Sequence, residues 1–586
     1  MRFEDLFRNS AFFQKSDSEN FGNGDNFTNP NMEKPILLSK GKMVKLILLE
    51  IVIVAILWYI SFPAFALNSS GLIFWAIAFG VFFTLLSLGF NKTSILGIRG
   101  VLSKQSRTNG LSRVFHYLAL VSIVFPLLYV FISPWVCGPI LNAKAFANRI
   151  QIENVDFSSV KEVDFTKTPI IDRNSTMVLG DRVMGQMPEL VSQFEVSDEY
   201  TQITYQGTVY RVTPLEYASF IKYLGNRSEG VPAYIMVNSV TGEAKLIKLK
   251  DLGLNGMKYV PSGYFNENLN RQLQLQYPTT IFGTPSFEID EEGHPWYVCT
   301  TYDFTGYGTR RRVTGVVLFD PITGESTKYS VDKAPKWVDR IYPEGLVMEE
   351  VDNNGLYSNG FLNSIFGQKN VTQTSDGYNY LAQDGDVYIY SGITSATNDS
   401  SNLAFVLVNL RTHEAMKISS PGANEYSAMN SAEGEVKNYG YESTFPLLVN
   451  VKGNPVYMMA LKDASGLIKK YAMVDATNYQ KVAVIDPDEG FNTLKKKFLG
   501  TEVEEEEDSK SNITKDIVVG RVQILNVDGK SKCFLTDNEG NRYKISVSSN
   551  NEDIIAFVKE GDSLSIEYVE DEAVHMIKKI SWKVEE

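Results

Sequence analysis

The chain has few of the residues that most enzymes and metal sites use. Its 586 residues include only three cysteines and four histidines. Three cysteines cannot build a disulfide framework. No histidine pairs with another at metal-ligand spacing, and the motifs H-E-x-x-H, C-x-x-C, G-x-S-x-G and the Walker loop are all missing. We therefore predict no catalytic, cofactor-binding or metal-binding residue, and we expect a protein that is not an enzyme.

An excess of positive charge is also lacking. The chain carries 56 Lys and Arg residues against 69 Asp and Glu residues, a formal net charge of −13. Nucleic-acid binding depends on positive charge, so we expect no nucleic-acid partner. Many extracytoplasmic proteins are held together by disulfides. An extracytoplasmic protein with almost no cysteine therefore fits a bacterial envelope, particularly one without a dedicated oxidation system.

Long apolar runs occur only near the N-terminus, and about 450 residues without one follow them. The runs are Leu46–Leu67, Gly71–Phe90 and Val114–Cys137. Each has about 20 residues, which is enough to span a bilayer as a helix. The sequence therefore predicts a three-helix membrane anchor that carries a large extramembrane region.

The positions of basic residues predict the orientation of this anchor. Lys42 and Lys45 precede the first run, and Arg99, Lys104 and Arg113 lie between the second and third. Basic residues near span ends stay in the cytoplasm. We therefore expect a cytoplasmic N-terminus, three spans of the cell membrane and an extracytoplasmic region that begins near residue 138.

Changes in composition divide the chain into six segments. The N-terminal segment lacks periodicity and reads as disordered, and an acidic run, Glu502–Asp508, reads as a linker. The predicted segments are a cytoplasmic tail (1–42), the membrane anchor (43–137), an α/β segment (138–280), α+β repeats (281–500), the linker (501–513) and a β-barrel (514–586). The expected fold class is α+β.

The α/β segment contains two predicted helices. Thr213-Pro214-Leu215-Glu216 forms a capping box with proline at the first helical position, which predicts a helix from Thr213 to about Leu224. Ser262–Gln276 places Phe265, Leu269 and Leu273 on one stripe, which predicts a second helix.

A degenerate pattern recurs along the ectodomain. A glycine turn opens a strand, and about 20 residues later an apolar strand ends in Asp or Asn before a second turn. An Asp or Asn side chain there can bind backbone amides two residues on, and glycine supplies a positive φ. The strands that end in this way precede Asn238, Asp320, Asn409 and Asp475.

One copy of this pattern resembles a known family. Val317–Glu325 reads V-L-F-D-P-I-T-G-E and resembles the V-D-x-x-T-G-E hairpin of PepSY-type domains, which are extracytoplasmic modules of envelope proteins. Thr-Gly-Glu is intact only in the first two copies, since His413 and Asn478 replace glycine in the others. The resemblance implies an envelope location and an interaction role, and it supplies no catalytic residue.

The last segment resembles an OB-fold. Its pattern of strand, hairpin, helix, strand and strand fits a five-stranded OB-like barrel. It has more acidic than basic residues and few aromatics, so a groove for single-stranded nucleic acid is not expected. We interpret it as a structural or protein-binding barrel.

One predicted loop, Tyr302–Arg312, combines aromatic residues with three consecutive arginines in an acidic region. Arginine forks suit carboxylate or phosphate partners, and aromatic rings stack on sugars. A solvated hairpin loop without a partner is the plain alternative. The residues predicted to contact a partner are Tyr302, Tyr307, Arg310, Arg311 and Arg312.

Two classes of function remain open from the sequence. The first is a membrane-anchored bacterial envelope protein that binds an envelope protein or an anionic wall polymer without catalysis. The alternative is a membrane-bound enzyme, or an accessory subunit of a transport or secretion complex, with a polar site assembled from scattered residues.

Overall fold

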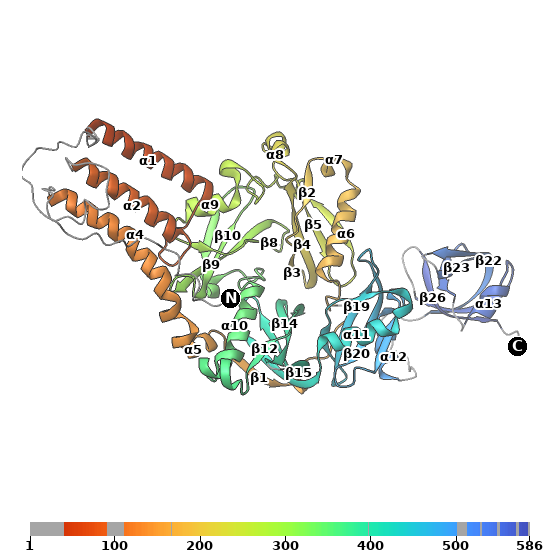
Figure 1. Ribbon diagram of the computed structural model, residues 1–586. Helices are drawn as coiled ribbons and strands as arrows, with labels where there is room; N and C mark the ends of the chain where they lie inside the picture. Colours follow the sequence, from red (N-terminus) through yellow and green to blue (C-terminus); the bar gives the residue numbers. More distant parts are fainter. Residues whose placement is uncertain are drawn as a thin grey trace, which may run out of the picture. The chain divides into compact units, whose positions relative to one another are not determined.

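The computed structural model describes residues 40–90, 110–165, 167–396, 398–500, 513–527, 530–547, 551–569 and 574–583. The chain divides into two compact units, Met1–Phe498 and Leu499–Glu586 (Figure 1). The first unit holds long apolar helices and four β-sheets, and the second holds a small barrel. The predicted tail and acidic linker lie almost entirely outside the described residues.

The predicted spans are confirmed as helices. In the described part of the chain, three helices are long and apolar enough to cross a membrane: α1 (Lys40–Ser61), α2 (Gly71–Phe90) and α4 (Gly110–Cys137). Small residues let α2 and α4 approach closely. The Ser87 hydroxyl donates to the Ser112 carbonyl at 3.0 Å, and the Ser112 hydroxyl donates to the Ser87 carbonyl at 2.9 Å.

The rest of the first unit contains four sheets, which we number in chain order. The first has β2 (Phe194–Val196), β3 (Thr201–Tyr205), β4 (Thr208–Tyr217), β5 (Ala233–Asn238) and β6 (Ala244–Lys248). The second has β7 (Ile281–Phe282), β8 (Ser286–Ile289), β9 (Pro295–Thr305), β10 (Arg310–Phe319) and β11 (Ser326–Tyr329). The third has β12 (Thr372–Thr374), β13 (Asn379–Gln383), β14 (Asp386–Ser395), β15 (Asn398–Asn409) and β16 (Ala415–Ala423). The fourth has β17 (Glu442–Ser443), β18 (Leu447–Val451), β19 (Asn454–Lys462), β20 (Ile468–Asp475) and β21 (Val482–Ile485).

The four sheets share one pairing scheme. In each, the first two strands pair one after the other with the third, and the third, fourth and fifth strands form consecutive antiparallel hairpins. A helix precedes each sheet in the chain: α6 (Arg173–Gly185), α9 (Leu269–Gln276), α10 (Glu344–Tyr357) and α11 (Glu425–Glu435). The first and second sheets also share one apolar core, in which the Tyr234 and Phe287 rings lie 5.7 Å apart.

The turns between the fourth and fifth strands have the predicted geometry. The side-chain oxygens of Asn238, Asp320, Asn409 and Asp475 each accept hydrogen bonds from the backbone amides two and three residues on. These side chains fix the reversal of the chain, as in other Asx turns. His413 has a φ of +67° at the position where the first two turns have glycine.

The chain that leaves the membrane anchor joins the third sheet before it reaches the first. After α4 it forms α5 (Pro139–Ala147), which packs on α10, and β1 (Ile152–Asp156), which pairs in parallel with β16. It next forms a bridge between Glu162 and Asn450 at the fourth sheet. This segment therefore connects sheets that are far apart in the sequence.

The predicted helix at Thr213 is wrong. Residues 208–217 form β4, in which Pro214 pairs with Tyr234 of β5. Helix α8 begins later, at Phe220, with the Ser219 side chain as its N-cap. Most of β4 is buried, so pairing and burial in the middle of the sheet outweigh the local capping signal.

The second predicted helix, Ser262–Gln276, is shorter than expected. It begins at Leu269, where the Asn268 side chain caps α9 by accepting from the Arg271 amide. Leu269 and Leu273 are buried as the stripe predicts. The residues just before Asn268 form a short 3-10 helix, Phe265–Glu267, and Phe265 is exposed, so its predicted place on the buried stripe is wrong.

The second unit is the predicted barrel. Its strands close in the order β22-β23-β24-β26-β25, and β24 and β26 pair in parallel. Their bounds are β22 (Ile513–Val527), β23 (Lys530–Asp537), β24 (Arg542–Ser546), β25 (Ser563–Val569) and β26 (His575–Trp582), with α13 (Glu552–Phe557) before β25. Apolar side chains such as Leu535, Leu564 and Ile566 fill the interior.

Candidate ligand pocket between the four sheets

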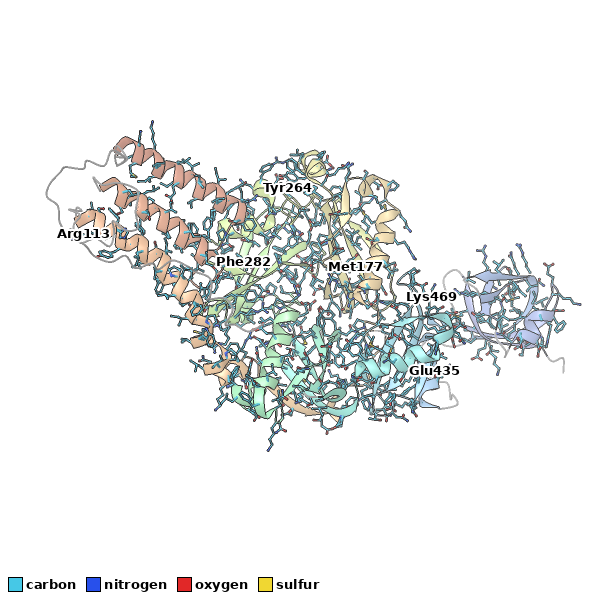
Figure 2. All side chains as sticks on the ribbon, in the orientation of Figure 1. Arg113, Met177, Tyr264, Phe282, Glu435 and Lys469 are labelled. Carbon is cyan, nitrogen blue, oxygen red and sulfur yellow. The ribbon has the colours of Figure 1, made fainter. Side chains whose placement is uncertain are left out.

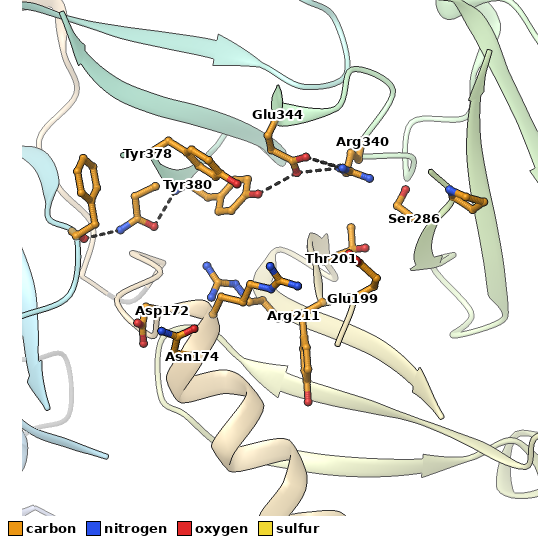
Figure 3. A pocket seen from close by; sticks show the side chains of 15 residues that line it. Asp172, Asn174, Glu199, Thr201, Arg211, Ser286, Arg340, Glu344, Tyr378 and Tyr380 are labelled. Atoms are coloured by element: carbon orange, nitrogen blue, oxygen red, sulfur yellow. Dashed lines mark hydrogen bonds and ion pairs between the residues drawn. The ribbon is translucent and has the colours of Figure 1, made fainter. Parts of the chain in front are cut away.

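A polar pocket of about 370 Å³ is lined by residues from all four sheets and the segments that lead into them (Figure 3). Its volume is at the lower end of the range for small-molecule sites. The lining residues are Asp172, Arg173, Asn174, Glu199, Tyr200, Thr201, Arg211, Pro285, Ser286, Arg340, Glu344, Tyr378, Asn379, Tyr380 and Phe445.

Arg211 is the buried cation of this pocket. It lies on β4 and is 3% exposed. Its Nε donates to the Gln202 side-chain oxygen at 3.2 Å, and its guanidinium carbon lies 5.7 Å from the centre of the Tyr380 ring. Its Nη1 has no hydrogen-bond partner among the described residues. Burial lowers the pKa of Arg211 from its usual value.

An ion pair occupies the wall formed by the third sheet and α10. The Arg340 Nε donates to both Glu344 carboxylate oxygens, at 2.8 and 2.9 Å, and the Tyr380 hydroxyl donates to the same carboxylate at 2.9 Å. Burial alone would raise the pKa of Glu344, but the Arg340 charge and these hydrogen bonds hold it below its usual value. Glu344 is therefore an anion that is already neutralised (Figure 3).

The Asp172 charge favours the cationic form of Arg211, but the Asp172 carboxylate is bound by other groups. The Asp172 carboxylate caps α6 through the Ser175 amide and accepts from the Lys462 ammonium at 2.6 Å. Glu199 is exposed to solvent. The pocket therefore has one buried guanidinium whose charge is not matched by a dedicated carboxylate.

Two buried carboxyl groups lie behind Ser286. The Ser286 hydroxyl donates to one oxygen of Glu288 at 3.3 Å, and the Asp339 amide donates to the other at 2.9 Å. The Asp339 carboxyl in turn accepts from the Thr204 amide at 2.6 Å. Burial raises the pKa of Glu288 to about 7 and raises that of Asp339 well above its usual value.

The five residues predicted to contact a partner lie on one hairpin, and none of them lines this pocket. The predicted loop, Tyr302–Arg312, is mostly strand, because β9 extends to Thr305 and β10 begins at Arg310. Only residues 306–309 form the turn. Cross-strand pairing of Thr305 with Arg310 carries the ladder out to the end of the hairpin.

The end of this hairpin contacts the apolar helices. The Asn68 side chain, between α1 and α2, donates to the Phe304 carbonyl at 2.6 Å. The Tyr307 amide donates to the Ser133 hydroxyl of α4 at 2.7 Å. A second cavity, of about 690 Å³, lies between the α1–α2 connection and the second sheet, and Phe282 (labelled in Figure 2) lines it.

The three arginines of the hairpin have different environments. Arg311 pairs with Glu349 of α10 at 2.8 Å. Arg310 lies over the Phe146 ring, with its guanidinium carbon 5.8 Å from the ring centre. The Arg312 side chain is 76% exposed and lies 3.5 Å from Asp303. Arg312 and part of Arg310 are therefore accessible, whereas Arg311 helps to hold the hairpin against α10.

Sequence reasoning missed the pocket, although one signal was present. Arg211 interrupts an apolar strand at Val209-Tyr210-Arg211-Val212, and a charge inside such a strand often has a specific role. Several of its neighbours in the pocket, such as Arg340, Tyr380 and Phe445, come from segments more than 100 residues away, and no local pattern connects them.

Comparison with models of known protein families finds no match, and comparison with curated proteins finds no significant relative. The resemblance to PepSY-type domains therefore rests on the short turn segments alone.

Proposed function

We propose that this protein is a membrane-anchored binding protein of a bacterial envelope, that it acts without catalysis, and that its sheets lie outside the cytoplasm. The observation that carries this proposal is the contact between the β9–β10 hairpin and the ends of the apolar helices. If the apolar helices span a membrane, exposed arginine would lie at the level where the spans end, next to the headgroup region.

The contacts between sheets and anchor support the orientation. They lie at one end of the helices, where the Tyr59 hydroxyl donates to Asn266 at 2.8 Å and the Phe65 amide donates to the Pro278 carbonyl at 2.8 Å. Lys40 and Arg113 lie at the opposite ends of α1 and α4. Basic residues favour the cytoplasmic side, so the sheets would face outward.

The shared pairing scheme supports an interaction role. We interpret the four sheets and their preceding helices as four copies of one α+β module, with the Asx turn as the common element. In this interpretation each copy carries the PepSY-like turn, which is intact in the first two copies and substituted in the other two. Such modules would give the protein a large rigid surface for an envelope partner.

The chemistry of the hairpin favours an anionic partner close to the membrane. Arg310 and Arg312 present guanidinium groups, and Tyr307 presents an aromatic ring. We propose an anionic wall polymer as the partner. An acidic face of an envelope protein would present the same chemistry, and it is the other partner that the sequence predicts.

Binding of a model polyanion by the full-length protein in neutral-lipid nanodiscs tests this function. The variant R310S/R312S removes the accessible charges and leaves the Arg311–Glu349 pair intact. The matched control is K245S/K250S, at exposed positions on β6 and in the 3-10 helix that follows it. Polyphosphate should bind the wild type and the control, and binding should weaken as salt rises. Equal binding by R310S/R312S would exclude the hairpin as the contact.

A further inference from the structure

We propose that the pocket between the four sheets binds a small anionic ligand, with a carboxylate or phosphate group held by Arg211. This site is distinct from the hairpin and does not depend on the function proposed above. A ligand here would touch residues contributed by all four sheets.

The cost of burying an unpaired charge is the first argument. A buried cation is unfavourable unless a counter-charge and hydrogen bonds compensate it. The neutral amide of Gln202 and the ring of Tyr380 are the polar and aromatic contacts that Arg211 makes, and its Nη1 makes none among the described residues. An anion in the pocket would supply the missing partner.

Two partly buried arginines, Arg149 and Arg340, have the carboxylate partner that Arg211 lacks. The Arg149 Nη1 lies 2.5 Å from the Glu349 carboxylate, and Arg340 binds Glu344 through two of its nitrogens. In both cases the carboxylate comes from α10 of the same chain. Arg211 is more deeply buried than Arg340 and has no such carboxylate, which is the arrangement expected when the counter-ion is a ligand.

The lining of the pocket limits the ligand. A cavity of about 370 Å³ admits only a small molecule. Glu344 is neutralised by Arg340, and Asp172 by Lys462, so neither repels an incoming anion at full strength. Exposed Glu199 disfavours a polyanion. The site therefore suits a compact ligand with one acidic group and an apolar or aromatic remainder that packs against Tyr378 and Phe445.

Isothermal titration calorimetry of the detergent-solubilised full chain tests this site. The probes are inorganic phosphate, acetate and benzoate, which separate a phosphate ligand from a carboxylate ligand and a bare carboxylate from one with an aromatic ring. We expect at least one probe to bind the wild type. Charged hydrogen bonds contribute enough that R211Q should weaken its binding by about tenfold or more. R211K should retain part of the affinity, because it keeps the charge but loses the fork.

R227Q is the control, since Arg227 is an exposed arginine that pairs with Glu267 away from the pocket. The melting temperature of R211Q should equal or exceed that of the wild type, because the substitution removes an uncompensated buried charge. If R211Q does not fold, R211K carries the comparison. Failure of every probe to bind at millimolar concentration, or equal binding by wild type and both Arg211 variants, would overturn the proposal.

Discussion

The backbone amide of Asp339 donates a 2.9 Å hydrogen bond to Oε2 of Glu288, and the two carboxyl side chains are buried next to each other. Asp339 also accepts from the Thr204 amide of the first sheet. A proton on at least one of these carboxyl groups relieves the repulsion between them. The pair therefore links the first and second sheets to the segment before α10 in a manner that depends on pH.

Because the pKa of Glu288 is raised in the folded chain, we expect the stability of the first unit to fall as pH rises. Its pKa is raised from 4.5 to about 7 in the folded chain. Between these values the unfolded chain releases the proton and the folded chain keeps it, so unfolding becomes easier. The stabilisation is complete below about pH 4.5 and is lost as pH rises through about 7. The expected change is on the order of 3 kcal/mol.

The variant E288Q isolates this effect, because its amide cannot ionise and its oxygen can still accept from Asp339. Melting temperatures of both proteins measured between pH 4.5 and pH 8 should converge at the acidic end and diverge at the basic end, where E288Q is the more stable. Buried groups with raised pKa values elsewhere, such as Glu216 and Glu425, are common to both proteins. Parallel curves would show that Glu288 is not the titrating group.

The Arg340–Glu344 pair predicts a large asymmetry between single and double substitutions. R340M leaves the Glu344 carboxylate buried without its cation, although the Tyr380 hydroxyl still donates to it, and the expected loss is about 3 kcal/mol. R340M/E344M removes both charges and should recover most of that loss. Thermal unfolding of the two variants measures the difference. A double variant as unstable as R340M would mean that packing, rather than the unpaired charge, causes the loss.

The elements that sequence reasoning predicted well are those with strong local signals. Apolar length identified the three spans, and the alternation of strands around one short helix identified the barrel. Asx residues identified the turns at Asn238 and Asp320. In each case the deciding residues are neighbours in the sequence.

The errors and omissions have a common physical origin in long-range pairing. Thr213 and Glu216 form a good capping box, but β4 is held in the middle of a sheet by strands on both sides. The pocket brings Arg211 near Tyr380 and Ser286, and such closeness arises from the packing of four sheets. A single sequence contains no record of that packing.

We expect the barrel to unfold separately from the first unit, and a substitution at Leu564 tests this. Its side chain is fully buried in the barrel core, and a leucine-to-alanine change in such a position costs about 2–5 kcal/mol. L564A should lower the melting temperature of the barrel and leave that of the first unit unchanged. Differential scanning calorimetry of the full chain resolves the two transitions. A shift of both would contradict independent folding of the two units.

The proposed orientation of the apolar helices predicts which residues a membrane-impermeant thiol reagent can reach. In a background without native cysteines, S70C lies between α1 and α2 at the predicted outer end, and K42C lies at the predicted inner end of α1. Intact cells without an outer barrier should allow labelling of S70C, and K42C should react only after permeabilisation. The reverse pattern would place the four sheets in the cytoplasm and remove the basis of the envelope proposal.

The contact between the hairpin and α4 predicts a specific disulfide. A Cβ atom at Gly306 would lie 2.7 Å from the Cβ atom of Cys137, about 1 Å less than the separation of about 3.8 Å in a natural disulfide, so the turn must move away from α4 by about that distance before the bond can form. The substitution G306C carries some strain, because φ at this position is +76°. Mild oxidation of membranes should link the new cysteine to Cys137, and mass spectrometry of the linked peptides identifies the pair. Cys299 and Cys533 are buried and should not compete. The variant D303C, on the same hairpin but without such a neighbour, is the control. If both variants link to Cys137 equally, or neither does, the hairpin does not rest on the end of α4, and its arginines are not held at the membrane surface.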